Sequence, residues 1–155
     1  MKKSKDTSSQ ATTVTELRSA VATHGKGAQP LFASQPAAGF PAPGDDMVER
    51  PLDINDLLVD HPESTFYVRV QGDSMEGVGI FSGDILVVDR SIEPRHGAIV
   101  VAAVYGELVV KRLEAKAGAG YQLVSAQVGY DPIEVNENED CTIWGIVTGS
   151  VRSFR

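Results

Sequence analysis

Short, alternating apolar runs in the larger, C-terminal part of the chain most constrain its fold. In the first run, Phe66, Val68 and Val70 fall on one face, because side chains alternate across an extended strand. Later runs are rich in Val and Ile and are broken by Gly, Pro and Asp, with no long helical pattern between them. The expected strands are 65–71, 85–89, 98–104, 107–113, 121–124 and 142–151, and Tyr105-Gly106 has the composition of a hairpin tip. The sequence therefore predicts a mainly β fold, a small, curled, mostly antiparallel β domain.

Composition divides the chain into two parts. Residues 1–39 are rich in Ser, Thr, Ala, Gln and Gly and have few large apolar side chains. Such a segment buries too little apolar surface to offset its ordering entropy. Leu17 and Val21 lie four residues apart and indicate at most one or two weak helical turns. We therefore expect residues 1–39 to form a flexible N-terminal arm and residues 40–155 to form the folded domain.

A linker and one short helix are expected at the start of the domain. Prolines and a glycine within residues 40–51 favour extended backbone. Asp53 can cap a helix that follows it, and His61-Pro62 ends it, because the residue before a proline avoids the helical region. The apolar face of this helix comprises Ile54, Leu57 and Leu58.

The net charge and the cysteine content limit the kinds of partner and cofactor that the chain is expected to bind. The formal net charge of −7 and the pI of about 4.9 argue against binding to the phosphate backbone of a nucleic acid. We therefore expect a protein partner and no sequence-specific DNA binding. The single cysteine, Cys141, cannot form an internal disulfide, and no Cys/His spacing resembles a zinc site, so we expect no metal or cofactor. The first residues lack the apolar run of a signal peptide, and no segment approaches the roughly 20 apolar residues of a membrane span. These features favour a cytoplasmic protein.

Lys111 is the first candidate for chemistry. It shares a strand face with Val109 and Leu113, while Arg112 faces the other way among apolar neighbours, so one of these cations must lie in an apolar environment. A buried lysine has a lowered pKa, and its neutral amine is a general base near pH 7. The alternative is an edge strand from which both cations reach solvent.

Ser74 is the second candidate, in the sequence GDSMEG at 72–77 directly after a strand. Flanking glycines permit a tight turn that leaves the hydroxyl uncrowded, and the turned backbone N–H groups could stabilise an oxyanion. A serine hydroxyl is a weak nucleophile until a base takes its proton. The alternative is an ordinary β-turn with local hydrogen bonds. His24, His61 and His96 could each serve as that base, but each has an ordinary role as a capping or surface residue.

Several motifs in order resemble the S24 peptidases, the LexA/UmuD group. They are Gly72-Asp73-Ser74-Met75, Gly83-Asp84-Ile85-Leu86-Val87-Val88-Asp89 and Val109-Val110-Lys111-Arg112-Leu113. Ser74 and Lys111 stand where that family keeps its Ser–Lys dyad. The UmuD-like branch is the most similar, because of the stretches 39–43 and 53–62 and because an N-terminal DNA-binding domain is missing.

The resemblance implies an autocatalytic serine endopeptidase that removes its own arm at the bond between Ala38 and Gly39. Lys111 would deprotonate Ser74, whose oxygen would attack the Ala38 carbonyl, and the backbone N–H groups of Asp73 and Ser74 would hold the oxyanion. Small residues around the scissile bond suit this chemistry, because the backbone must come within about 3 Å of the nucleophile. The arm is longer than is usual in this branch, and Ala38 stands at a position where cysteine occurs in UmuD proteins.

The resemblance also implies partners and a role in the SOS response to DNA damage. A RecA filament on single-stranded DNA would activate self-cleavage, and a homodimer of trimmed chains would join a UmuC-like Y-family DNA polymerase subunit in error-prone translesion synthesis. Three alternatives remain: a non-cleaving interaction module, a fragment of a LexA-like repressor, and a signal-peptidase-like enzyme that cuts other chains.

Overall fold

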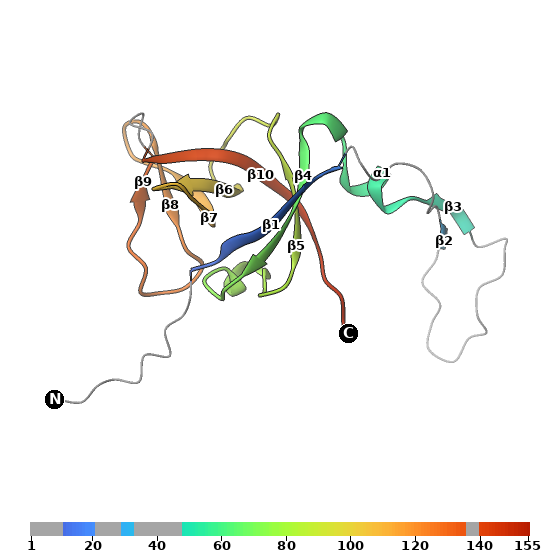
Figure 1. The fold of residues 1–155 in the computed structure, drawn as a ribbon. Helices are drawn as coiled ribbons and strands as arrows, with labels where there is room; N and C mark the ends of the chain where they lie inside the picture. Colours follow the sequence, from blue (N-terminus) through green and yellow to red (C-terminus); the bar gives the residue numbers. More distant parts are fainter. Residues whose placement is uncertain (1–10, 21–28, 33–47, 136–139) are drawn as a thin grey trace.

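An antiparallel sheet organises the computed structural model, which describes residues 11–20, 29–32, 48–135 and 140–155 (Figure 1). Its strand order is β1-β4-β5-β10-β6-β7-β8-β9, and β1 also pairs with β7, so that six strands close into a barrel. The strands are β1 (Thr13–Ser19), β4 (Thr65–Gln71), β5 (Ile85–Asp89), β6 (Ile99–Val104), β7 (Glu107–Ala115), β8 (Tyr121–Val124), β9 (Ile133–Glu134) and β10 (Cys141–Val151). The predicted mainly β, mostly antiparallel fold is confirmed.

All six strands predicted from the sequence are present, with small shifts at their ends. The hairpin between β6 and β7 turns at Tyr105 and Gly106, as predicted, and both residues have positive φ, at 49° and 79°. Positive φ at both central residues is the geometry of the two-residue turn that matches the twist of the flanking strands. Gly106 supplies it without strain, since it has no Cβ.

The core consists of two clusters of buried apolar side chains. The first contains Val68, Val70, Met75, Ile80, Leu86, Val88, Val101 and Val110. The second contains Val100, Ala102, Val109, Leu113, Leu123, Cys141 and Ile146. Neighbouring residues of β6 and β7 belong to different clusters, so both faces of these strands are buried. This explains why their sequences are continuous apolar runs and do not alternate. Burial also raises the pKa of the Cys141 thiol, consistent with a small core residue.

The predicted short helix is α1 (Ile54–Leu58), and Asp53 caps it as expected. The Asp53 carboxylate accepts a hydrogen bond of 2.9 Å from the Asn55 backbone N–H. The apolar face of α1 is only partly covered, since Ile54 is 50% exposed and Leu57 is 55% exposed. The linker prediction is wrong for its last residues, because β3 (Val48–Leu52) pairs with β2 (Gln29–Phe32) in a separate two-stranded sheet.

The N-terminal segment departs most from expectation. The predicted helical turn is wrong, because residues 13–19 form β1 and pair with β4 from Thr13 opposite Gln71 to Ser19 opposite Phe66 (Figure 1). This segment buries too little apolar surface to be ordered on its own, and it becomes ordered here by pairing with a strand that comes about 50 residues later. Ala38 and Gly39 lie outside the described residues, and the division of the chain at residue 39 stays a prediction. No helix within the described ranges is long and apolar enough to cross a membrane.

Candidate active site

Ser74 lies in the tight turn that follows β4, and it is fully buried. Gly72 enters this turn at a φ of 111°, a conformation that glycine adopts and that strains residues with a side chain. The next residue, Met75, is fully buried in the first core cluster and begins a short 3₁₀ turn over Glu76–Val78. The position of Ser74 is thus fixed by the turn that Gly72 permits on one side and by the buried side chain of Met75 on the other.

Lys111 is the buried cation of β7. It pairs with Val100 of β6, and the adjacent residues of β7 pair with β8, so the edge-strand alternative is excluded. Its exposed fraction is 5%, and burial lowers its pKa below the ordinary lysine value, because charge is disfavoured away from water. Arg112 instead reaches the surface, where it forms an ion pair of 3.1 Å with Glu114.

The loop after β8 contacts both candidate residues, and sequence reasoning missed it. The Lys111 Nζ donates a hydrogen bond of 2.6 Å to the Ser125 Oγ, and the Ala126 N–H donates one of 3.0 Å to the Ser74 carbonyl. The Lys111 Nζ also lies 5.0 Å from the centre of the Tyr130 ring. Consecutive residues of this loop therefore hold the amine of Lys111 and the backbone of Ser74 at one site.

Thr12 is an unexpected neighbour of Ser74. Its backbone N–H donates to the Ser74 Oγ at 2.8 Å, and the Ser74 hydroxyl donates to the Thr12 Oγ1 at 3.1 Å. The Thr12 carbonyl accepts a bond of 2.9 Å from the Val110 N–H of β7. Thr12 is fully buried, although the sequence placed it in a flexible arm. No local signal could have revealed this contact, because it joins residues 62 apart in the chain.

The remaining candidates have the following positions. Asp73, a predicted oxyanion residue, precedes Ser74 in the turn, and its carbonyl accepts a bond of 3.2 Å from the Glu76 N–H. The His61 Nδ1 lies 2.6 Å from the Asp89 carboxylate, and the His96 Nδ1 accepts a bond of 3.0 Å from the Ala115 N–H, so these two histidines have ordinary structural contacts. His24 lies outside the described residues.

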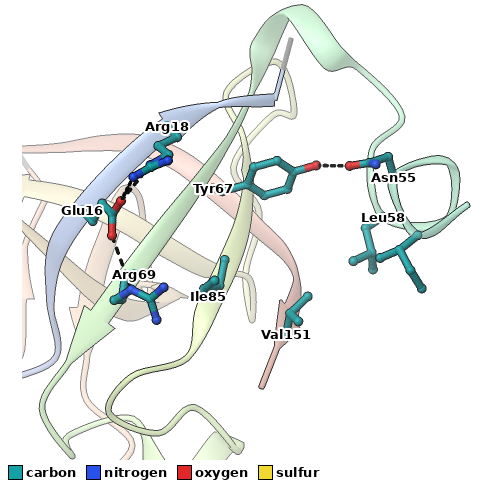
Figure 2. A pocket seen from close by; sticks show the side chains of 9 residues that line it. Glu16, Arg18, Asn55, Leu58, Tyr67, Arg69, Ile85 and Val151 are labelled. Carbon is teal, nitrogen blue, oxygen red and sulfur yellow. Dashed lines mark hydrogen bonds and ion pairs between the residues drawn. The ribbon is translucent and has the colours of Figure 1, made fainter. Parts of the chain in front are cut away.

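A surface pocket of about 480 Å³, separate from these residues, is lined by side chains of β1, β4, α1 and the ends of β5 and β10 (Figure 2). The Glu16 carboxylate on its wall accepts hydrogen bonds from Arg18 at 2.7 Å and from Arg69 at 3.4 Å. Across the pocket, the Tyr67 hydroxyl donates to the Asn55 side chain at 2.7 Å. The Arg69 bond ties the exposed side of β1 to β4.

A barrel in which a buried serine and a buried lysine contact the same loop defines a class of protein. The chain belongs to the S24 peptidase family, since the family model described as Peptidase S24-like matches residues 30–148. Membership supports a hydrolase of the serine-peptidase type, and it confirms the family predicted from the sequence motifs.

Individual relatives are similar over most of the chain. Protein ImpA of Salmonella typhimurium is 39% identical over 127 residues, which cover 82% of this chain and 86% of ImpA. Protein MucA of Escherichia coli is 38% identical over 122 residues, which cover 79% of this chain and 83% of MucA. The LexA repressor of Thiobacillus denitrificans is 37% identical over 122 residues, covering 78% of this chain and 60% of the repressor.

Proposed function

We propose that this chain is a self-cleaving Ser–Lys peptidase that cuts its own bond between Ala38 and Gly39. Ser74 is the nucleophile and Lys111 is the general base. One observation carries the proposal: consecutive residues of the loop after β8 contact both the amine of Lys111, whose pKa is lowered by burial, and the carbonyl of the buried Ser74. A neutral amine beside a hydroxyl is the activation that a serine nucleophile requires.

The reaction follows from these two roles. The neutral Lys111 amine takes the Ser74 proton while the Ser74 oxygen forms a bond to the Ala38 carbonyl carbon. Backbone N–H groups of Asp73 and Ser74 stabilise the resulting oxyanion. The C–N bond then breaks, and the proton on Lys111 passes to the departing Gly39 amine. A water molecule, deprotonated by the same amine, releases the acyl group from Ser74.

Ser125 is a positioning residue in this mechanism. Its hydroxyl accepts a hydrogen bond from Lys111, which fixes where the flexible lysine side chain ends. A four-carbon side chain without such a partner would sample many rotamers and lose near-attack geometry. The bond leaves the nitrogen lone pair free for the Ser74 proton.

The cellular role that we propose is in the SOS response, where the trimmed chain is an accessory subunit of an error-prone translesion DNA polymerase. A RecA filament on single-stranded DNA activates the cut, the product is a homodimer, its partner is a Y-family polymerase subunit, and all of this takes place in the cytoplasm. The similarity to ImpA and MucA and the UmuD-like motifs support this role.

One mass-spectrometric experiment tests the function. The purified chain is incubated at mildly alkaline pH, and separately with RecA, ATP and single-stranded DNA, with Ser74→Ala alongside. We expect a fragment that begins at Gly39 from the wild type only. A wild type that stays intact in both conditions would contradict self-cleavage and favour a non-cleaving interaction module.

A second candidate function is suggested by the similarity to a LexA repressor, of which this chain covers 60%. A LexA-like repressor would bind a specific operator. The −7 charge argues against such binding, and a gel-shift experiment with the intact chain decides between the two functions.

A further inference from the structure

The segment 11–20 fills a seam of the barrel between β4 and β7. On one side, six residues of β1 pair with β4. On the other side, Thr13 lies opposite Val109, and the Thr12 carbonyl accepts the Val110 N–H. Without this segment the two strands would leave open the part of the sheet where Ser74 lies. A seam with an unpaired strand on each side is a site for an extended peptide, which binds by adding its backbone to both edges.

Thr12 occupies the position that a substrate must take. It donates to the Ser74 oxygen and accepts from the Ser74 hydroxyl, so the proton that a base must remove and a lone pair that must attack are both engaged. The group that meets the Ser74 oxygen is an amide N–H, whereas cleavage requires a carbonyl carbon. The segment is thus bound as an inhibitor binds and not as a substrate.

Contacts along the whole segment hold it in the seam. Val14 packs against the first core cluster, and Ala20 at the far end is 1% exposed. The pairing with β4 is irregular between Val14 and Glu16 and resumes with Glu16 opposite Arg69, where the two side chains also form an ion pair. On the surface, that ion pair forms part of the wall of the pocket drawn in Figure 2.

We propose that the seam between β4 and β7 is the peptide-binding site of the peptidase, and that residues 11–20 occupy it in the resting chain as an internal competitor of the scissile segment. The inference rests on the proposed function, because it concerns access to Ser74. Thr12 and Ala38 cannot both lie against one hydroxyl. The segment 11–20 therefore has to leave the seam before the bond between Ala38 and Gly39 can enter it.

A serine-reactive fluorophosphonate measures access to Ser74 without requiring self-cleavage. Intact mass gives the labelling rate of the wild type, of a chain that lacks residues 1–20, and of Ser74→Ala as the blank. We expect the shortened chain to be labelled at least about tenfold faster, as for a segment docked in roughly nine of ten wild-type molecules. Its cutting at Ala38 should accelerate by a similar factor. Circular dichroism reports whether the shortened chain is folded.

A second experiment keeps every residue of the segment and locks it in place. Glu16 and Arg69 are partners across β1 and β4 with partly exposed side chains, and such pairs have the Cα separation that a disulfide needs. In the variant Glu16→Cys/Arg69→Cys, oxidation should slow labelling and cutting at least about tenfold below the reduced protein, and reductant should restore both. Glu16→Cys alone is the matched control and should not respond to oxidation.

The outcomes separate this inference from the proposed function. Faster labelling after deletion, slower labelling in the locked variant, and no fragment starting at Gly39 would support the inference while contradicting the assigned scissile bond. Equal labelling rates for the wild type, the shortened chain and the locked variant, or no labelling of any of them, would overturn the inference. A wild-type fragment beginning at Thr12 would also overturn it, because residues 11–20 would then be a substrate.

Discussion

The substitution Gly77→Ala tests whether the loop after β8 sets the geometry of the candidate dyad. A Cβ added at Gly77 would lie 2.6 Å from the Ala126 carbonyl oxygen and 3.2 Å from the Ala126 Cβ. Ordinary contact begins at 3.4 Å, so the Ala126 backbone would have to retreat by about 0.8 Å (3.4 − 2.6). The same displacement would disturb the Ala126 hydrogen bond to Ser74 and shift the adjacent Ser125 away from Lys111.

A displacement of about 1 Å at a reacting group costs roughly 100-fold in rate, so Gly77→Ala should slow self-cleavage by about that factor. Overpacking of this kind should also lower the free energy of unfolding by about 1–3 kcal/mol. Quantitative intact mass over time gives the rate, and thermal unfolding followed by circular dichroism gives the stability.

The matched control is Gly83→Ala. Gly83 has a φ of +91° and no atom within 4 Å of an added Cβ, so alanine there strains the backbone by roughly 1–2 kcal/mol without pushing on residues 125–126. It should lose stability and keep its cleavage rate. A folded Gly77→Ala that cuts at the wild-type rate would refute the role of the loop. An equal loss of rate in both variants would attribute the effect to stability.

The other predictions concern the base, its partner and a buried carboxylate. Lys111→Met should abolish cutting and keep the fold, since it replaces a buried amine by an apolar chain of similar size; intact mass and circular dichroism check this, and cutting at neutral pH would contradict it. In the wild type, the cutting rate should rise with pH through the lowered pKa of Lys111, because only its neutral amine accepts a proton, and a flat profile would contradict this. Ser125→Ala should slow cutting about tenfold, as expected for loss of a hydrogen bond worth about 1.5 kcal/mol, while Ser125→Thr keeps most of the rate. Burial alone would raise the pKa of Asp89, but hydrogen bonds led by those from Ser91 and His61 outweigh it and lower that pKa to about 2. The stability from this carboxylate is present above about pH 4 and lost as pH falls toward 2, so acid titration of thermal stability should show a loss of about 2 kcal/mol in the wild type that Asp89→Asn lacks.

The strands after residue 65 could be predicted because their signals are local. Alternation in β4, apolar runs in β6 and β7, and the turn residues Tyr105-Gly106 each lie within a few neighbouring positions. The strands β1, β2 and β3 could not be predicted in the same way. β1 is polar on its own and becomes a strand only because β4 supplies a distant pairing edge.

In the candidate site, too, only the residues with a local sequence signal could be predicted. Lys111 stood out because a cation interrupts an apolar strand, and Ser74 stood out because glycines flank it after a strand. Ser125 and Thr12 carry no such signal. A serine after a strand and a threonine in a polar segment are common, and their roles arise only where the folded chain places them against Lys111 and Ser74.

The position of β1 as the closing strand of the barrel has a consequence for the product of a cut at residue 38. Loss of β1 would turn β4 from an internal strand into an edge strand, with a row of backbone donors and acceptors that had been paired. Arg69 would lose its Glu16 partner and stand as a bare charge on that edge, a feature that discourages indiscriminate strand pairing. Hydrolysis followed by release of β1 would thus replace a fully paired strand with an exposed edge strand that carries an unpaired positive charge. Because the peptide bond does not re-form, the change would be irreversible.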